Sequence, residues 1–314
     1  MSALPYLDAA TVERLLPMER AVDVLEDALR TGLDPEATPQ RPIVDVPGGQ
    51  LLLMPAATGR YAGVKAVTIA PANPGRGLPR IQGTYLLFDG ASLAPLAVLD
   101  GIALTSLRTP AVSALAVRHL AEPDARRLVV FGSGPQAWGH VLALRAVRPV
   151  EDVTVVGRDP DRAEALAARC RDLGLTARGH TNAAQDPVAE AVAGADLIAC
   201  CTTAREPLFP GKLARDGATV VAVGSHEPDA RELDDDLVAR ATVVVEARTA
   251  ALEEAGDVIV AIRRGTITSR HLAGDLADLI AGRVVAGPGP RVFKSTGMAW
   301  EDLVVAAAAY EAWT

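Results

Sequence analysis

Cysteine, lysine and long hydrophobic runs are scarce in this 314-residue chain, and each shortage excludes a class of protein. The three cysteines, Cys170, Cys200 and Cys201, fit neither a disulfide framework nor a zinc-ligand spacing, so we expect buried, unreactive thiols. The longest apolar runs, such as VVAAAAY near the C-terminus, are far shorter than the roughly 20 residues that a membrane span requires. The N-terminus also has no basic segment followed by an apolar core. The sequence therefore predicts a cytoplasmic protein without a membrane segment.

Positive charge is not concentrated anywhere in the chain. The net charge is −8 and no basic block occurs, so the electrostatic signature of a nucleic-acid-binding protein is missing. The five histidines are scattered without the spacing of metal ligands, which predicts no metal site. A small-molecule partner is therefore the better expectation.

Arginine replaces lysine almost throughout: the chain has 28 arginines but only three lysines, Lys65, Lys212 and Lys294. A retained lysine in such a chain indicates a position that requires a compact ammonium, because an ammonium differs from a guanidinium in shape and in how readily it loses a proton. Survival by chance is the alternative explanation.

The middle of the chain alternates between apolar strands and helices. RRLVVF at residues 126–131 and VTVVG at residues 153–157 are predicted strands, and each is followed by a segment with apolar residues at helical spacing. Continuous apolar strands separated by helices indicate a parallel sheet that is covered on both faces. The sequence therefore predicts an α/β fold with a Rossmann-type, doubly wound parallel sheet domain at residues 119–291.

The first 118 residues have a different pattern, with one amphipathic helix at residues 17–32 followed by short strands joined by Gly, Pro and Asp turns. Strands without intervening helices predict an antiparallel or mixed sheet, and hence a second, smaller α+β domain. The apolar C-terminal helix, MAWEDLVVAAAAYEAW, is expected to pack back on this domain after a return linker at residues 286–291. The smaller domain is therefore predicted to comprise residues 1–118 plus 292–314.

A glycine-rich turn lies between the first of these parallel strands and its helix. It reads GSGPQA and matches the G-x-G-x-x-A pattern of dinucleotide-binding proteins. In that pattern the first glycine allows a tight turn, the second lets the backbone approach a pyrophosphate, and the small third residue lets the helix pack on the strand. An ordinary glycine-rich turn is the alternative, but the position between strand and helix favours a cofactor site. The predicted cofactor-binding residues here are Gly132, Gly134, Pro135, Gln136 and Ala137.

The end of the second strand indicates which dinucleotide binds. NAD-binding sites usually place an acidic residue there to hold the ribose hydroxyls. This chain has Gly157 and Arg158 instead, and a guanidinium suits a 2′-phosphate through charge-assisted hydrogen bonds. The sequence therefore favours NADP(H) over NAD(H). The alternative is that Arg158 is solvated and that Asp159, one residue later, takes the acidic role.

One arginine is predicted at an unfavourable position, the start of a helix. TPAVSALAVRHLA reads as a helix with Thr109 as its cap and Pro110 at its first position, so Arg108 lies beside the positive end of the helix dipole. This placement costs a few tenths to about 1 kcal/mol and suggests an anion nearby, although a surface arginine is the simpler reading. With Arg41 and Lys65 in the same domain, three cations are available for one substrate carboxylate.

Five segments, in order along the chain, carry a family resemblance: KAVTIAPANPGRGLPRIQGTYLLFD, LDGIALTSLRTPAVSALA, GSGPQAWGH, VGSHEPDAREL and VFKSTGMAWEDL. Together they resemble the ornithine cyclodeaminase/μ-crystallin family of amino-acid and imine oxidoreductases over nearly the whole chain. The resemblance implies a Rossmann domain inserted into a substrate-binding domain and an active site in the cleft between the two domains. It also implies that the substrate-binding domains pair to form a homodimer.

The resemblance further implies roles for individual residues. Arg41, Lys65 and Arg108 match the family's grip on the substrate carboxylate, and Thr109 matches a phosphate contact. Arg80 lies near a position that contacts the cofactor in some members. The positions implied to line the adenine, ribose or nicotinamide are Thr202, Val223, Lys294 and Ser295.

Differences in two segments separate this chain from the cyclodeaminases of the family. Arg158 resembles the NADPH-using branch represented by μ-crystallin, a ketimine reductase, whereas NAD-bound cyclodeaminases have an acid where this chain has Gly157. Cyclodeaminases also carry an aspartate at the position of His226 and a lysine at that of Ala230. That aspartate is thought to orient the substrate's amino groups and to activate water during ammonia loss, so its absence argues against cyclodeamination.

Reduction of a cyclic ketimine requires a grip on the carboxylate, a hydride donor and a proton for the nitrogen. His226 is one candidate proton donor, since an unperturbed histidine titrates near 6.5. Lys65 is the other, because an ammonium in a cationic cluster should have a lowered pKa. The alternative for His226 is a polar residue at the strand end, hydrogen-bonded to Glu227 or Asp229.

We therefore expect an NADPH-dependent reductase of cyclic ketimines of the Δ1-pyrroline-2-carboxylate or Δ1-piperideine-2-carboxylate type, giving cyclic amino acids. The first alternative is an ornithine or lysine cyclodeaminase or an alanine dehydrogenase, because the same scaffold serves all of these activities. The second alternative is a non-catalytic, NADPH-linked binding protein. Such a protein would be expected to lose the cluster of Arg41, Lys65 and Arg108, which this chain retains.

Overall fold

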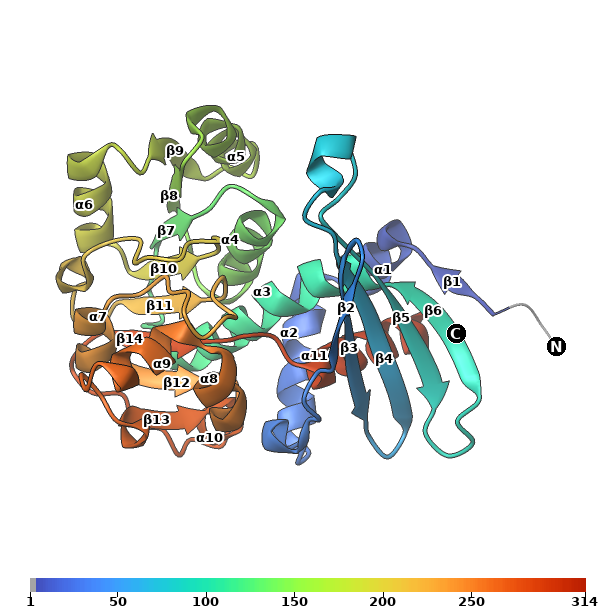
Figure 1. The fold of residues 1–314 in the computed structure, drawn as a ribbon. Helices are drawn as coiled ribbons and strands as arrows, with labels where there is room; N and C mark the ends of the chain where they lie inside the picture. The colour runs from blue at the N-terminus through green and yellow to red at the C-terminus, as the bar shows by residue number, and fades with distance from the viewer. Residues whose placement is uncertain (1–3) are drawn as a thin grey trace. The chain divides into compact units, whose positions relative to one another are not determined.

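A computed structural model of the chain describes residues 4–314, which form two compact units (Figure 1). One unit comprises the chain up to Thr109 together with Met298–Thr314, and the other comprises Pro110–Gly297. The second unit therefore interrupts the first in sequence.

The first unit is built on a six-stranded mixed sheet. Five strands are antiparallel neighbours in the order β6-β5-β4-β3-β2, and β1 pairs with β6 in parallel. In the described residues 43–100, no crossover helix lies between successive antiparallel strands. Such a helix, or a connection of similar length, would be needed only if successive strands were parallel. The strands are β1 (Tyr6–Leu7), β2 (Ile43–Val46), β3 (Gly49–Ala57), β4 (Tyr61–Ile69), β5 (Ile81–Asp89) and β6 (Pro95–Asp100).

Side chains alternate between the two faces of this sheet. Along β4, Tyr61, Gly63, Lys65 and Val67 are buried, whereas the residues between them are half-buried or exposed. Helix α11 packs against β3, β4 and β5 and also against α1 and α2, so the last helix of the chain completes the core of this unit. The helices are α1 (Ala9–Leu15), α2 (Met18–Arg30) and α11 (Ala299–Trp313), with 3₁₀ turns at Pro35–Ala37 and Asn73–Arg76.

Helix α3 (Gly101–Leu120) begins about two turns earlier than the sequence predicts. Thr109 is not its cap and Pro110 is not its first residue, because both lie in the middle of the helix. Asp100 caps the observed start, where its carboxylate accepts hydrogen bonds from two backbone N–H groups of the first turn. Burial of apolar residues on both sides of Pro110 stabilises a continuous helix in spite of the missing N–H group.

The second unit is built on an eight-stranded parallel sheet in the order β13-β12-β14-β11-β10-β7-β8-β9. The chain runs from β7 through β8 to β9 and then returns to form β10 on the other side of β7. This reversal of direction is the switch point at which doubly wound sheets bind their ligands. The strands are β7 (Arg127–Phe131), β8 (Asp152–Gly157), β9 (Thr176–Thr181), β10 (Leu197–Cys200), β11 (Thr219–Ala222), β12 (Thr242–Val245), β13 (Leu272–Asp275) and β14 (Arg291–Lys294).

Helices cover both faces of the parallel sheet. Val129 and Phe131 of β7 pack in one core with residues of α6, α7 and α9, whereas Leu128 and Val130 alternate to the other face and are equally buried. Burial on both faces explains why these strands read as continuous apolar runs. The helices are α4 (Pro135–Val147), α5 (Pro160–Asp172), α6 (Gln185–Gly194), α7 (Asp235–Arg240), α8 (Arg248–Glu254), α9 (Gly256–Arg263) and α10 (Leu276–Ile280), with 3₁₀ turns at Gly211–Leu213 and Ser269–His271.

The unit boundaries differ from those expected from the sequence, which lie at residues 118/119 and 291/292. The first boundary falls inside α3, after Thr109. The second falls after Gly297, because β14 pairs with β11 and β12 inside the parallel sheet. The segment AGPGPR therefore leads into a central strand rather than back to the first unit. The predicted fold class, a Rossmann-type sheet with a smaller α+β unit, is confirmed. Among residues 4–314, no helix is long and apolar enough to cross a membrane.

Candidate functional site

Lys65 extends from the middle of β4 onto the buried face of the first sheet. The residue is 1% exposed, and its ammonium nitrogen lies 2.8 and 2.7 Å from the two carboxylate oxygens of Asp302 on α11. It also donates a hydrogen bond of 3.0 Å to the hydroxyl oxygen of Thr105 on α3. That hydroxyl donates its own proton to the carbonyl oxygen of Gly101, so it acts only as an acceptor toward Lys65. Acceptors on two helices therefore hold the ammonium.

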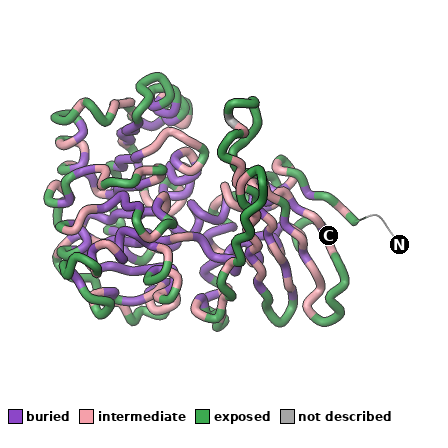
Figure 2. The backbone as a smooth tube through the Cα atoms, in the orientation of Figure 1, coloured by how far each residue is buried: buried purple, intermediate pink, exposed green. Residues whose placement is uncertain are grey.

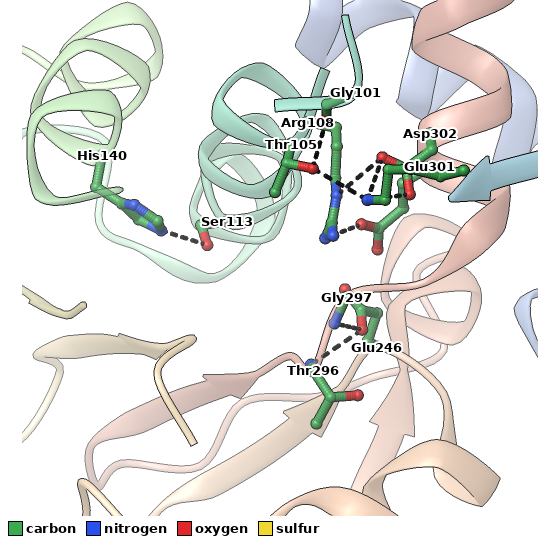
Figure 3. A network of polar contacts seen from close by, with 11 residues as sticks. Gly101, Thr105, Arg108, Ser113, His140, Glu246, Thr296, Gly297, Glu301 and Asp302 are labelled. Atoms are coloured by element: carbon green, nitrogen blue, oxygen red, sulfur yellow. Dashed lines mark hydrogen bonds and ion pairs between the residues drawn. The ribbon is translucent and has the colours of Figure 1, made fainter. Parts of the chain in front are cut away.

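Arg108, one turn further along α3, lies beside this pair. Its Nη1 donates to Glu301 Oε2 at 2.8 Å, and its Nε lies 3.4 Å from Asp302 Oδ1. Figure 3 shows Arg108, Glu301 and Asp302 turned toward one another. Arg108 is 6% exposed and both acids are completely buried. Lys65, Arg108, Glu301 and Asp302 thus form a charge-balanced group, which we call the buried ionic cluster.

Burial makes the Lys65 ammonium an easier proton donor. Loss of hydration disfavours the charged form and lowers the pKa of Lys65 to about 8; Asp302 opposes this shift and Arg108 adds to it. An amine with such a pKa is mostly charged at neutral pH and still gives up its proton readily. It therefore suits proton transfer to a substrate.

The structure brings together two of the three cations predicted to hold a substrate carboxylate. Lys65 and Arg108 belong to the buried ionic cluster, whereas Arg41 lies half-buried in the segment before β2. The prediction that Arg108 precedes a helix start is wrong, because it lies inside α3 and its charge is matched by Glu301. Arg80 is exposed just before β5, and its contact with a cofactor, like that of Thr109 with a phosphate, stays a prediction.

The glycine-rich turn connects β7 to α4. Gly132 has a φ of 113°, and a Cβ atom there would lie 2.5 Å from the carbonyl oxygen of Cys201. Gly134 precedes α4 with a φ of −95°, and a Cβ atom there would meet no atom within 4 Å. Gly132 is thus required by the backbone itself, whereas Gly134 leaves space beside the N–H groups of the helix N-terminus, which fits an approaching pyrophosphate. The first turn of α4 contains Pro135, Gln136 and Ala137.

Strand β8 ends without an acidic side chain. Its last residue, Gly157, is buried, and the nearest atom to a Cβ there would be 3.4 Å away. Arg158 is exposed and, in the part of the chain that the structure describes, makes no hydrogen bond or ion pair. Asp159 caps α5, because its Oδ1 accepts from two backbone N–H groups of the first turn at 3.0 and 3.2 Å. The acid nearest the strand end is therefore engaged by its own helix.

A buried carboxylate ties together the segments that follow β10 and β11. Glu232 is completely buried and accepts from the backbone N–H of Thr202 at 2.8 Å, from its hydroxyl at 2.7 Å and from the N–H of Gly224 at 2.8 Å. Loss of hydration raises the pKa of Glu232, and Lys294 opposes that shift. Glu232 therefore holds Thr202 and Gly224, the residue after Val223, at the carboxyl edge of the sheet, where such folds bind ligands. The predicted cofactor contacts of Thr202 and Val223 stay predictions.

Lys294 ends β14 and is 1% exposed. Its ammonium nitrogen lies 3.1 Å from Asp257 Oδ2, and the other oxygen of Asp257 accepts from the backbone N–H groups of Glu232 and Leu233. The charge of Lys294 is thus engaged by a buried acid. The predicted contacts of Lys294 and Ser295 with a cofactor stay predictions.

His226 lies in the loop after β11 with an exposed side chain. Of the two acids that the sequence offered as its partners, Glu227 forms an ion pair with Arg205 and Asp229 forms one with Arg263, each at 2.7 Å. A part for His226 in proton transfer stays a prediction.

His140 is a buried structural residue of the second unit. Its Nδ1–H donates to the carbonyl oxygen of Gln136 at 2.8 Å, so its Nε2 accepts from the hydroxyl of Ser113 at 2.9 Å (Figure 3). Loss of hydration lowers the pKa of His140 to about 4, which keeps the ring neutral. The ring thereby fixes the helix that carries the glycine-rich turn against α3.

Sequence reasoning missed the acidic partners of Lys65 and Lys294. Glu301 and Asp302 offer a signal, because two acids interrupt the apolar helix MAWEDLVVAAAAY and a buried acid needs a partner. The signal for Glu232 is weaker, because Glu232 lies in the acidic segment RELDDD, and such a segment resembles the exposed start of a helix. Nothing local marks Asp257, whose partners lie 24 residues or more away in sequence.

A groove of about 690 Å³ lies at the opposite edge of the parallel sheet, before β7, β8 and β10. Its lining includes Asp196 together with Arg127 and Arg215, and each of the two arginines forms an ion pair with Asp196. Ligands of such sheets bind at the carboxyl ends of the strands, so this groove is not the cofactor site. Within residues 4–314, no group of three or more His, Cys, Asp or Glu side chains is placed to hold a metal ion.

Comparison with known proteins extends the likeness over the whole chain. The model of the ornithine cyclodeaminase/mu-crystallin family matches residues 6–314. The Delta(1)-pyrroline-2-carboxylate reductase of Bacillus cereus (strain ZK / E33L) is 38% identical over 267 residues, covering 83% of this chain and 80% of its own length. Ketimine reductase mu-crystallin of Mus musculus is 37% identical over 258 residues, covering 80% of this chain and 75% of its own length.

A solved structure matches both units. Thermococcus litoralis Delta(1)-pyrroline-2-carboxylate reductase, in complex with NADH and L-proline, has a TM-score of 0.89 and 31% identity, covering 98% of this chain and 97% of its own. The family predicted from the sequence motifs is confirmed. The chain belongs to the ornithine cyclodeaminase/mu-crystallin family.

Proposed function

We propose that the chain is an NADPH-dependent reductase of cyclic ketimines such as Δ1-pyrroline-2-carboxylate and Δ1-piperideine-2-carboxylate. The observation that carries the proposal is the buried ionic cluster, in which Lys65 and Arg108 combine a proton donor with a carboxylate ligand. The relatives in Bacillus cereus and Thermococcus litoralis support the reduction of a cyclic imine. The L-proline bound to the second is the product expected from reducing Δ1-pyrroline-2-carboxylate.

The reaction adds a hydride to the ring carbon of the C=N bond and a proton to the ring nitrogen. Nicotinamide, when bound, supplies the hydride. Arg108 and Arg41 would hold the substrate carboxylate through paired, charge-assisted hydrogen bonds. Lys65 would give its proton to the nitrogen and recover it from water. His226 is the alternative donor.

One assay tests this function. The purified protein is mixed with NADPH or NADH and each cyclic imine, and in parallel with ornithine, lysine or alanine and the oxidised cofactors. We expect reduced cofactor to be consumed in equal amount to the imine. Release of ammonia from ornithine or lysine without net cofactor reduction would indicate a cyclodeaminase, and oxidation of alanine would indicate an alanine dehydrogenase. Either result would overturn the proposal.

The preference for NADPH is supported by the end of β8, where Arg158 is exposed and Asp159 is engaged as a helix cap. The Thermococcus litoralis relative was solved with NADH, so the preference of this chain between NADPH and NADH has to be measured. In the assay above, Arg158→Ala should raise the KM for NADPH about 10- to 100-fold, because charge-assisted hydrogen bonds to a phosphate contribute roughly 1.5–3 kcal/mol. The KM for NADH should change little.

The matched control is Arg162→Ala, which removes an exposed arginine four residues later, in the first turn of α5. It should leave both KM values unchanged. Equal increases for NADPH and NADH in Arg158→Ala would contradict a role for this arginine in recognising the 2′-phosphate.

We further propose that two copies of the chain pair through the face of the first sheet opposite to Lys65. Val64, Leu86 and Val98 lie side by side on that face in three neighbouring strands and are only partly buried. The edge strand β2 is exposed along its length (Figure 2), and its Val44, which the register places on the same face as Val64, is 48% exposed. An apolar surface of this kind marks an interface, and burying it against a second copy would remove it from water.

Sedimentation should give a mass of twice the 32.7 kDa chain for the natural protein. Leu86→Asp should give a folded monomer, because the pairing would bury an unpaired carboxylate. Val285→Asp is the control, since Val285 is 86% exposed and lies in the other unit; it should remain dimeric. A natural protein of single-chain mass would exclude the homodimer.

A further inference from the structure

Lys65 has little rotational freedom. An ammonium has three N–H groups. The carboxylate of Asp302, with oxygens at 2.8 and 2.7 Å, takes one of them, and the hydroxyl of Thr105 at 3.0 Å takes another. One N–H therefore remains, and its direction is set by the two acceptors.

Two adjacent acids on α11 serve different cations. Glu301 Oε2 accepts from Arg108 Nη1 at 2.8 Å, whereas both oxygens of Asp302 face Lys65. Asp302 touches Arg108 only through Oδ1, at the longer distance of 3.4 Å. Asp302 is therefore the partner of Lys65, and Glu301 is the partner of Arg108.

The titratable groups that face Lys65 are Asp302 and Glu301 on α11, Arg108 on α3 and Tyr85 on β5. Tyr85 is the cross-strand neighbour of Lys65; burial, with a contribution from Asp302, raises the pKa of Tyr85 well above its usual value, so its hydroxyl stays neutral. Among these groups, Asp302 contributes most to keeping the proton on Lys65.

We propose that Asp302 is a positioning residue for proton transfer, which keeps Lys65 charged and directs its remaining N–H at the substrate nitrogen. This inference rests on the proposed imine reduction. In that step, the N–H bond of Lys65 breaks as the N–H bond of the product forms, while the hydride from the reduced cofactor adds to the ring carbon. Lys65 is left neutral and then takes a proton from water. Asp302 keeps its negative charge throughout.

The sign of the pH effect follows from these charges. Imine reduction needs the charged form of Lys65, so kcat/KM should fall as the pH rises through a pKa of about 8. Removing the charge of Asp302 removes the strongest influence that raises this pKa. The fall should then begin at a lower pH, by about one unit or more.

The experiment is a pH profile of kcat/KM for Δ1-pyrroline-2-carboxylate with the natural protein, Asp302→Asn and Glu301→Gln. Asp302→Asn should move the midpoint of the fall to lower pH, so that kcat/KM is lower by about fivefold or more at pH 8 and recovers part of that loss near pH 6. Glu301→Gln should mainly raise the KM of the imine, because its partner is Arg108, and should shift the midpoint less. The dissociation constant for NADPH, measured by fluorescence titration, should be unchanged in both.

Asp302→Asn leaves a buried ammonium with a weaker partner, which is destabilising, so Thr105→Val provides a second test that remains if the first variant does not fold. Valine has nearly the shape of threonine but lacks the hydroxyl that accepts from Lys65. Thr105→Val should lower kcat about 5- to 10-fold at all pH values, and it should shift the midpoint of the pH profile less than Asp302→Asn does. This inference would be overturned if Asp302→Asn had the same pH profile of kcat/KM as the natural protein. If Asp302→Asn does not fold, an unchanged profile in Thr105→Val would overturn it. A natural protein without imine reductase activity at any pH would instead overturn the proposed function.

Discussion

Replacement of Lys65 by methionine is expected to lower kcat/KM for Δ1-pyrroline-2-carboxylate by about 10³-fold, within the range of about 10²–10⁴ that a positioned proton donor contributes. Methionine keeps the length and apolar character of the buried stem but cannot donate a proton. Stopped-flow or steady-state oxidation of NADPH measures the loss. The dissociation constant for NADPH should stay the same, because Lys65 is not part of the glycine-rich turn that is expected to hold the pyrophosphate.

The double variant Lys65→Met with Asp302→Asn separates the loss of the proton donor from a loss of stability. The single variant leaves the buried carboxylate of Asp302 with only its longer contact of 3.4 Å to Arg108, which is destabilising, whereas the double variant removes both charges. It should therefore be more stable than the single variant and equally inactive. If Lys65→Met retains most of the activity while His226→Ala loses it, the histidine is the donor.

Much of the fold follows from local patterns in the sequence. The apolar runs RRLVVF and VTVVG form neighbouring strands of the parallel sheet, and the turn-rich N-terminal segment forms the predicted mixed sheet. These patterns are informative because strands buried on both faces must be continuously apolar. The predicted helix start at Thr109 and Pro110 was wrong because a local pattern was overridden by packing. A proline in a helix often occupies its first turn, but burial of apolar residues on both sides of Pro110 keeps α3 continuous.

The candidate site was only half visible in the sequence. Lys65 and Gly132 stand out, one by the rarity of lysine and the other by its motif. Asp302 lies 237 residues from Lys65, and Glu232 lies 30 residues from Thr202, so their pairing depends on how distant elements meet. An acid that holds a catalytic group needs no motif of its own; it needs only to be buried in the right place. Such partners become visible when the fold is known.

The two glycines of the turn should fail in different ways when each is replaced by alanine. Gly132→Ala should destabilise the protein without any ligand, because its φ of 113° is unfavourable for alanine and its Cβ would lie 2.5 Å from the carbonyl oxygen of Cys201. Strain of this kind costs about 1–3 kcal/mol, and the steric clash adds to it. At 3 kcal/mol, thermal unfolding should occur about 6–12 °C lower.

Gly134→Ala is the matched control and should behave in the opposite way. Its φ of −95° suits alanine and its Cβ would meet no protein atom within 4 Å, so the melting temperature without cofactor should change by little. The added methyl group would, however, occupy the space through which the pyrophosphate approaches the N-terminus of α4, and the affinity for NADPH should fall at least about tenfold. Calorimetry with and without NADPH measures both effects. Unchanged affinity in Gly134→Ala would mean that the pyrophosphate does not bind at this turn, because no other atom of the protein competes for the space that the methyl group fills.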